Sequence, residues 1–272
     1  MLAPLFSLSL GYERAQNYKH NIHYGDEMQA LEFTFIGEDN RLKFCERELK
    51  KYLVFAEEGI RQALIYAPNK TLSPEEALNI EVGSMVFAGR ASNETIKALK
   101  SSMFVPFLSD FEFVEANAKL TAEGALALII EKSGFSLFKQ KILIIGYGRI
   151  GKALTKLLWD TGAKFAVASR DTSKVQNGVP SVTTGAWELD KFDTIVNTAP
   201  ALVLDERELN EMKEDAVYFE LASPPYGIDL AAAEKLNRTV HIEPAIPARF
   251  MYKEAGRLMI ETFKHYFTFV KL

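Results

Sequence analysis

The chain has 272 residues, of which 48% are hydrophobic and 25% are charged, and its formal net charge is −4 at pH 7. This length gives ample core for two domains, and a weakly negative chain without a basic block argues against nucleic acid or an anionic membrane surface as a partner. The single cysteine, Cys45, excludes an intrachain disulfide, and the sequence carries neither a bilayer-length apolar run nor a signal-peptide pattern, so we expect a cytoplasmic protein.

Residues 1–28 show no regular pattern, and we treat them as an N-terminal extension to which no role is assigned. His20 and His23 lie three residues apart, but no further ligand candidate is close to them in the sequence. We therefore predict no metal site.

Residues 29–116 alternate short apolar segments with helical patterns, which predicts a small α/β domain whose parallel sheet is covered by helices on both faces. The expected strands are 31–36, 52–56, 84–88 and 103–108, and the expected helices are 41–51, 57–63 and 93–101.

Residues 117–136 are expected to form a helix that bridges this domain and a second one, because Leu120, Leu126 and Ile130 have helical spacing. Asn117 or Thr121 is the expected N-cap. A helix in that place would form the floor of a cleft, with its first two turns near a bound substrate. The residues concerned are Asn117, Lys119, Thr121 and Glu123, and helix capping with first-turn charges is the alternative explanation for them.

Residues 141–158 carry a dinucleotide fingerprint. The apolar run 142–145 predicts a strand buried on both faces, and the helical pattern starts at Arg149, so the glycines of GYGRIG lie in a strand-to-helix turn. Gly146 allows the tight bend, Gly148 lets the backbone approach a pyrophosphate, and Gly151 lets helix and strand pack closely. The predicted cofactor-binding residues of this turn are Gly146, Tyr147, Gly148, Arg149, Ile150 and Gly151.

The end of the next strand, 164–168, favours one nucleotide over another. An NAD-binding chain usually has an acidic residue there for the ribose hydroxyls, whereas this chain has Ser169 and Arg170. A guanidinium pairs well with a 2′-phosphate, and Thr172, Ser173 and Lys174 offer further donors, so we predict NADP rather than NAD. If the strand ends one residue later, Asp171 is the alternative partner, for the ribose of NAD.

Residues 137–248 complete an α/β domain of the Rossmann type, with further strands expected at 192–196, 216–221 and 239–242. Ligands of such sheets bind at the carboxyl ends of the strands, which places Asn197, Thr198, Ala199, Pro200 and Ala222 on the rim of the cofactor site. In residues 249–272 we expect a helix from 251 to 267 that returns to the first domain.

Several of these segments resemble the A subunit of dipicolinate synthase. The resemblance covers the chain from about residue 117 to the C-terminus and is thinner before it, where Gly37, Asp39 and Arg41 carry it. The matching segments are NAKLTAEGA (117–125), GYGRIG (146–151), the strand end at 168–170, NTAP (197–200), ELASPPYGID (220–229) and EPAIPARFMYKEAG (243–256). The chain departs from the family pattern at Tyr226 and Ile228, at Ala245 and Ala248, and at Tyr252 and Glu254.

This resemblance implies an oxidoreductase that oxidises a dihydrodipicolinate-type cyclic dicarboxylate with hydride transfer to NADP, partnership with a flavoprotein B subunit, and a role in sporulation. Aromatising such a ring requires a hydride acceptor, a base for a proton, and cations for two carboxylates. The predicted catalytic residues are Lys253, Glu123 and Asn117, and the predicted substrate-binding residues are Lys119, Thr121 and Arg249.

Three other functions stay open at this point. A shikimate-dehydrogenase-like reductase has only Ser7-Leu8-Ser9 in its favour, and a 2-hydroxyacid dehydrogenase lacks a good counterpart of its catalytic histidine, because His241 lies in a strand pattern and His265 on the last helix. A non-catalytic NADP-binding or sensing subunit would explain the altered motifs. Two-domain chains of this kind often pair, and a homodimer is left open.

Overall fold

The computed structural model describes residues 30–57 and 59–272, and its helices and strands form two compact units. Unit 1 comprises the described residues up to Asn117 together with Met251–Leu272, and unit 2 comprises Ala118–Phe250. The helix α5 (Phe111–Lys132) contains the first boundary. The expected extension at 1–28, with His20, His23 and Ser7-Leu8-Ser9, lies outside the described residues.

Unit 1 is built on a four-stranded parallel sheet in the order β1-β3-β5-β7. Its elements are β1 (Glu32–Ile36), α2 (Asn40–Leu49), β2 (Tyr52–Phe55), β3 (Gln62–Tyr66), β4 (Thr71–Leu72), α3 (Pro74–Leu78), β5 (Ser84–Ala88), β6 (Arg90–Ala91), α4 (Asn93–Ala98), β7 (Met103–Pro106), the 3-10 turn η1 (Phe107–Ser109), the start of α5, α10 (Tyr252–Lys264) and β14 (Thr268–Lys271). Two short pairs, β2 with β14 and β4 with β6, complete it.

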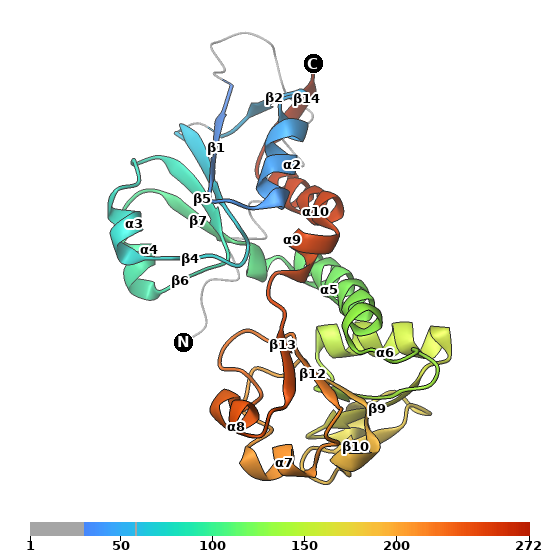
Figure 1. The fold of residues 1–272 in the computed structure, drawn as a ribbon. Coiled ribbons are helices and arrows are strands. Elements are labelled where there is room, and N and C mark those ends of the chain that lie inside the picture. The colour runs from blue at the N-terminus through green and yellow to red at the C-terminus, as the bar shows by residue number, and fades with distance from the viewer. Residues whose placement is uncertain (1–29, 58) are drawn as a thin grey trace. The chain divides into compact units, whose positions relative to one another are not determined.

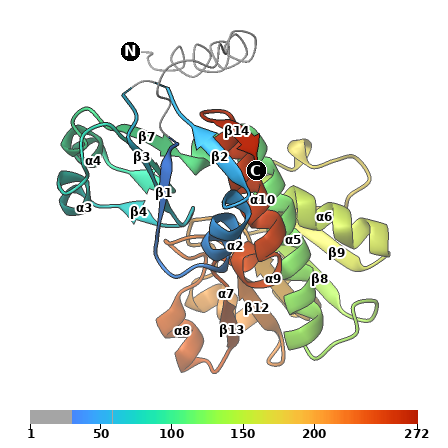
Figure 2. The same ribbon diagram turned by 90° about the horizontal axis from the view of Figure 1, so that it is seen from above.

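The C-terminal helix α10 packs against α2 (Figure 2). A Cβ on Gly256 would lie 2.6 Å from the ring of Phe44, so only glycine allows this approach. The Cys45 thiol donates to the carbonyl of Gly256 at 3.2 Å, and burial raises its pKa to about 12. Phe87 and Phe263, 4.9 Å apart, join α10 to the sheet. The helix ends at Lys264 rather than at 267, because the chain turns into β14.

The polar residues that follow β1 form a buried ion pair. Asp39 caps α2 by accepting from the amide of Arg41, and the Arg41 guanidinium donates to both oxygens of Asp39, at 2.9 and 2.6 Å, and to Asn69 at 3.1 Å. Both side chains of the pair are less than a tenth exposed. The pair therefore links the segments that follow β1 and β3, which are neighbours in the sheet.

Two sequence expectations for unit 1 and α5 are wrong. The described residues of the segment 57–63 are not helical: Gln62 begins the strand β3, which lies between β1 and β5 and is buried over most of its length. The helix α5 does not start at Asn117 or Thr121, because Asp110 accepts from the amide of Phe113 at 3.0 Å and caps a helix that begins at Phe111.

Unit 2 is built on a six-stranded parallel sheet in the order β10-β9-β8-β11-β12-β13. Its elements after α5 are β8 (Lys141–Ile145), α6 (Arg149–Thr161), β9 (Lys164–Ser169), η2 (Thr172–Lys174), β10 (Ser181–Thr183), η3 (Leu189–Lys191), β11 (Thr194–Asn197), α7 (Glu206–Glu211), β12 (Val217–Glu220), α8 (Leu230–Lys235), β13 (Thr239–Ile242) and α9 (Ile246–Phe250). Numbered within the sheet, this is the order 3-2-1-4-5-6 of a Rossmann fold. The predicted α/β class with parallel sheets is confirmed.

The two faces of this sheet are covered by different helices (Figure 1). Ile142 and Ile144 pack with residues of α5 and α6, whereas Leu143 and Ile145 pack with residues of α7 and α8. The continuous apolar run of β8 follows from this burial on both faces. The strand order reverses between β8 and β11, and that is the place where such sheets bind ligands.

Candidate cofactor site

The turn after β8 needs glycine at two positions. Gly146 has φ +98°, and a Cβ there would lie 2.7 Å from the hydroxyl oxygen of Thr198. A Cβ on Gly151 would lie 2.1 Å from the carbonyl oxygen of Gly146. The turn and the first turn of α6 are therefore in backbone contact, and the amide of Thr198, at the end of β11, donates to the carbonyl of Ile145 at 2.8 Å beside them.

Gly148 differs from these two because a Cβ on it would meet no atom of the described residues within 4 Å. It is the N-cap of α6, a helix of 13 residues, with no capping side chain. The space beside this N-terminus is therefore open, and the first amides of a helix, which lack acceptors within the helix, carry a partial positive charge that favours an anion there. This open cradle fits a pyrophosphate, which would lie against the amide groups of Gly148, Arg149 and Ile150.

The end of β9 lies one residue beyond the expected position. The strand ends at Ser169 rather than at 168, so Asp171 comes closer to the sheet than predicted. Its carboxylate, however, accepts from the amide of Ser173 at 3.1 Å and the hydroxyl of Ser173 at 2.6 Å, and pairs with Lys174 at 3.3 Å. These contacts lower the pKa of Asp171. Arg170 is exposed at the strand end, whereas Lys174 is already paired.

Tyr147 joins the glycine turn to the segment that follows β9. Its hydroxyl accepts from the amide of Gln176 at 3.3 Å, and the Lys152 ammonium lies 5.6 Å from the centre of its ring. The fingerprint and the predicted phosphate-binding segment are thus held in one arrangement within unit 2.

A buried carboxylate, that of Glu220, holds together the rim of the cofactor site at the ends of β11 and β12. Glu220 ends β12, is 1% exposed, and accepts four hydrogen bonds: from Asn197 at 2.8 Å, Tyr218 at 2.9 Å, the amide of Ala222 at 2.9 Å and the amide of Gly227 at 2.7 Å. Burial, followed by the Glu220 charge, raises the pKa of Tyr218, which keeps its hydroxyl a donor. The sequence predicted Asn197 and Ala222 but not Glu220, although an acid that ends an apolar strand was a usable signal.

Asn197 also fixes the loop that carries Thr198, Ala199 and Pro200. Its amide group donates to the carbonyl of Ala199 at 2.9 Å, and its carbonyl oxygen accepts from the amide of Ala199 at 3.1 Å. The structure therefore gathers the predicted cofactor residues of the glycine turn and of the β11 and β12 ends at one edge of the sheet.

The predicted substrate and catalytic residues are divided between the units. Asn117 and Lys253 belong to unit 1, and Lys119, Thr121, Glu123 and Arg249 belong to unit 2. Lys119, Glu123 and Lys253 are exposed, and Thr121 is buried. Their common site stays a prediction.

Arg249 has a partner within unit 2. It forms an ion pair with Glu243, which is 4% exposed and also accepts from Lys132 at 2.6 Å. Burial alone would raise the pKa of Glu243, but the hydrogen bonds from Lys132 and Arg249 outweigh it and hold that pKa below its usual range. The cluster ties the end of α5 to the segment after β13.

This cluster predicts a pH-dependent stability of unit 2. A carboxyl group with a lowered folded pKa stabilises the protein above its unfolded pKa, and this contribution disappears as the pH falls through the folded pKa. We expect Glu243→Gln to be less stable than wild type at neutral pH, with the difference shrinking as the pH falls below the ordinary glutamate pKa of about 4.3. Melting curves across this range measure it, and a difference that is constant with pH would contradict the ion-pair role.

Among residues 30–57 and 59–272, no three His, Cys, Asp or Glu side chains gather as a metal site. In the same part of the chain, no helix combines the length and apolar character that crossing a membrane requires.

Comparison with known proteins finds similarity to NAD-binding proteins. Residues 112–223 match the family model of the D-isomer specific 2-hydroxyacid dehydrogenase NAD binding domain. The A subunit of dipicolinate synthase from Bacillus subtilis (strain 168) is 26% identical over 183 residues, a match that covers 64% of this chain and 62% of that protein. The matched part thus spans less than two thirds of the curated relative.

Two solved structures show how far the fold extends. The A subunit of dipicolinate synthase from Bacillus halodurans superposes with a TM-score of 0.72 at 20% identity, covering 87% of this chain and 98% of that one. The apo-structure of D-lactate dehydrogenase from Escherichia coli gives a TM-score of 0.60 at 13% identity, covering 85% and 94%. The resemblance inferred from the sequence is confirmed, with this chain as a divergent relative.

Proposed function

Because the chain is a divergent relative of the A subunit of dipicolinate synthase with a 2-hydroxyacid-dehydrogenase-type NAD-binding domain, we propose that it is a cytoplasmic, NADP-dependent oxidoreductase acting on a dihydrodipicolinate-type cyclic dicarboxylate. The observation that carries the proposal is the open cradle at Gly148, at the point where the strand order reverses. It supports binding of a nicotinamide dinucleotide. The preference for NADP, the binding of the substrate and the removal of its proton are assigned to individual residues below.

In this proposal the cofactor, when bound, accepts a hydride from the substrate ring. Gly148 and the first amides of α6 bind its pyrophosphate, and Arg170 binds a 2′-phosphate. Thr198 and Ala199 hold the rim beside the glycine turn. Lys119 and Lys253 would bind substrate carboxylates, and Glu123 would take the ring proton. Loss of the hydride and of this proton converts the substrate ring into an aromatic ring. Arg249, which pairs with Glu243 through Nη1, would offer its remaining guanidinium donors to a substrate carboxylate.

The nucleotide preference can be tested at Arg170. We expect wild type to bind NADP more tightly than NAD, and Arg170→Ala to lose about 10- to 100-fold in NADP affinity, because a charge-assisted pair contributes about 1.5–3 kcal/mol. NAD affinity should be unchanged. Calorimetric titration with both nucleotides measures this, with Arg207→Ala, an exposed arginine on α7, as the matched control.

Two outcomes would contradict this assignment. An equal loss of affinity for NADP and for NAD in Arg170→Ala would mean that the guanidinium does not bind the 2′-phosphate. A wild type that prefers NAD, and loses that preference in Asp171→Ala, would assign the ribose to Asp171.

The catalytic assignment can be tested at Lys253 and Glu123. We expect Lys253→Ala and Glu123→Ala to reduce NADPH formation from dihydrodipicolinate at least 100-fold, as removal of a general acid or base typically does. The controls are Lys264→Ala on α10 and Glu131→Ala on α5, which remove the same charges from the same helices. Full activity in the first two variants would remove both residues from the mechanism.

The rival function is a non-catalytic NADP-binding subunit, which the altered residues Tyr226, Ala245 and Ala248 favour. Such a protein would bind NADP but leave the dicarboxylate unchanged, with or without an added flavoprotein. The flavoprotein partner and a homodimer remain proposals that the same assays, together with light scattering, address.

A further inference from the structure

An open strand edge lies at the opposite end of β9 from the glycine turn. The last strand of the sheet, β10, pairs with β9 only along Val167–Ser169, so among the described residues no strand lies beside Lys164–Ala166 on that side. The amide of Val167 donates to the carbonyl of Pro180 at 2.9 Å, where the chain leaves the edge. Alternate residues of a strand face the same neighbour, so the N–H and C=O of Phe165 face this open side as well.

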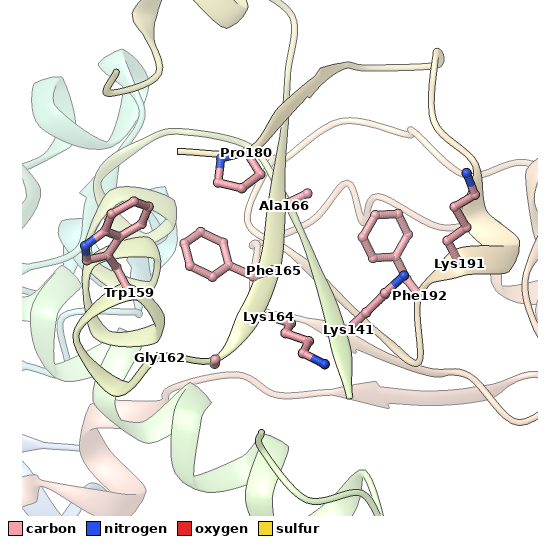
Figure 3. Close-up of a pocket in the computed structure, with 10 residues that line it drawn as sticks. Lys141, Trp159, Gly162, Lys164, Phe165, Ala166, Pro180, Lys191 and Phe192 are labelled. Atoms are coloured by element: carbon pink, nitrogen blue, oxygen red, sulfur yellow. The ribbon is translucent and has the colours of Figure 1, made fainter. Parts of the chain in front are cut away.

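A hollow of about 590 Å³ follows this edge, and we call it the edge groove. Its lining includes Trp159, Phe165 and Pro180 and, on the other face of the sheet, Lys141, Lys164 and Phe192 (Figure 3). Phe165 belongs to the core on the α6 side, whereas Phe192 belongs to the core on the α7 and α8 side. The groove therefore runs around the edge of β9 and reaches both faces of the sheet.

The α6 face of the edge groove is aromatic. The rings of Trp159 and Phe165 lie 6.4 Å apart in an edge-to-face arrangement. Trp159 lies in the last turn of α6, and 54% of its surface is exposed. An exposed indole beside an open strand edge is typical of a surface that a partner covers.

The opposite face of the edge groove is basic. Lys141 and Lys164 are register partners on β8 and β9, so two like charges lie side by side. Lys191 also lines the groove, but its charge is paired. Among the described residues that line the groove, none carries a carboxylate. Two acids close to these lysines in the chain have partners already: Asp193 accepts from the amide of Lys141 and pairs with Lys213, and Glu188 pairs with Lys191.

We propose that the edge groove binds an extended acidic segment of a partner protein, which adds as a strand beside Lys164–Ala166. Successive side chains of a strand point to opposite faces, so apolar side chains of the segment would lie against Trp159 and Phe165 while its carboxylates face Lys141 and Lys164. A segment that alternates apolar and acidic residues satisfies both faces and the open backbone of Phe165. A flat anionic small molecule would satisfy one face only.

The test uses three synthetic heptapeptides with blocked ends. One alternates glutamate and valine (EVEVEVE), one has the same composition in blocks (EEEEVVV), and one replaces glutamate by lysine (KVKVKVK). We expect the alternating acidic peptide to bind the full-length protein at least tenfold more tightly than the other two, with an affinity that falls as salt rises. Binding is followed by tryptophan fluorescence, because Trp159 is exposed and Trp187 is buried.

Variants of the protein locate the site. The double variant Lys141→Glu/Lys164→Glu should lose at least tenfold in affinity for the alternating peptide, whereas Lys97→Glu, a charge reversal at an exposed lysine of unit 1, should not. Dinucleotide binding, measured in parallel, should be the same in all three proteins, which separates this proposal from the proposed function. A double variant that no longer unfolds cooperatively is replaced by Trp159→Ala, for which the same loss is expected. Because this variant lacks the reporting indole, its binding is measured by calorimetric titration.

The proposal would be overturned if the alternating acidic peptide did not bind, or if the block peptide bound as tightly. It would also be overturned if the double variant bound the alternating peptide as tightly as wild type does. Competition by benzoate at a concentration equal to that of the peptide would indicate a small-molecule site instead. A dimer that Lys164→Glu dissociates would overturn it as well, by showing that a second copy of this chain covers the edge instead.

Discussion

Gly148→Ala is expected to weaken binding of the dinucleotide about 10- to 100-fold while leaving the fold almost unchanged. The new Cβ meets no atom of the described residues within 4 Å, and φ at this position is −78°, which alanine adopts freely. The methyl group would enter the space through which the pyrophosphate approaches the backbone, where crowding of this kind costs about 1–3 kcal/mol. Loss of glycine as N-cap adds less than about 1 kcal/mol.

Gly151→Ala is the matched comparison, because its Cβ would lie 2.1 Å from the carbonyl oxygen of Gly146. Neither group can move without opening the turn, so this variant should lose both binding and about 1–3 kcal/mol of stability. Calorimetric titration with NADP and thermal melts separate the two. If Gly148→Ala bound NADP as wild type does, the cradle would not be the phosphate site.

Most of unit 2 was predictable because its signals are local, although the short strand β10 and the helix α7 were not expected. The apolar run of β8, the glycine spacing and the helical pattern of α6 follow one another within 18 residues, and the strand order then follows from connection rules. The polar strand ends at Asn197 and Ala222 could be placed on the rim for the same reason.

The errors occur where distant parts of the chain decide the structure. The strand β3 was expected to be helical up to residue 63, because a short apolar run bordered by charges fits either structure, and burial between β1 and β5 selects the strand. Similarly, α5 begins at Phe111 because the Asp110 carboxylate is directed at its first turn, whereas the sequence alone offers Asn117 and Thr121 as equally good caps.

Glu220 illustrates the same limit at the site. The glutamate is visible in the sequence as the end of an apolar segment, but its donors come from positions 197 to 227 and meet only after β11 and β12 pair in register. The edge groove is a second case, because the pairing of Lys141 with Lys164 depends on the register of β8 and β9. Local patterns predict elements, and register decides which side chains share a face.

Glu220→Ala should have the largest effect on stability, about 3–5 kcal/mol in the free energy of unfolding. Four donors would lose their acceptor in a site that is 1% exposed, and each unsatisfied buried donor costs about 1–3 kcal/mol, less where water enters the space left behind. Both tryptophans lie in unit 2, so urea unfolding followed by tryptophan fluorescence reports on this unit. Glu234→Ala, which removes an exposed carboxylate from α8, is the control.

Glu220→Gln separates stability from the positioning of the rim. The amide oxygen can still accept from Asn197 and the amide of Ala222, and the Tyr218 hydroxyl can turn to accept from the new NH2 group. The amide of Gly227 and the hydroxyl hydrogen of Tyr218 are left without their acceptor, at a cost of about 1–3 kcal/mol each, less where water enters. This variant should therefore remain folded, with the loop before Gly227 displaced and NADP affinity reduced about tenfold. A stable Glu220→Gln protein with wild-type affinity would show that the network supports the fold of unit 2 and does not position the cofactor rim.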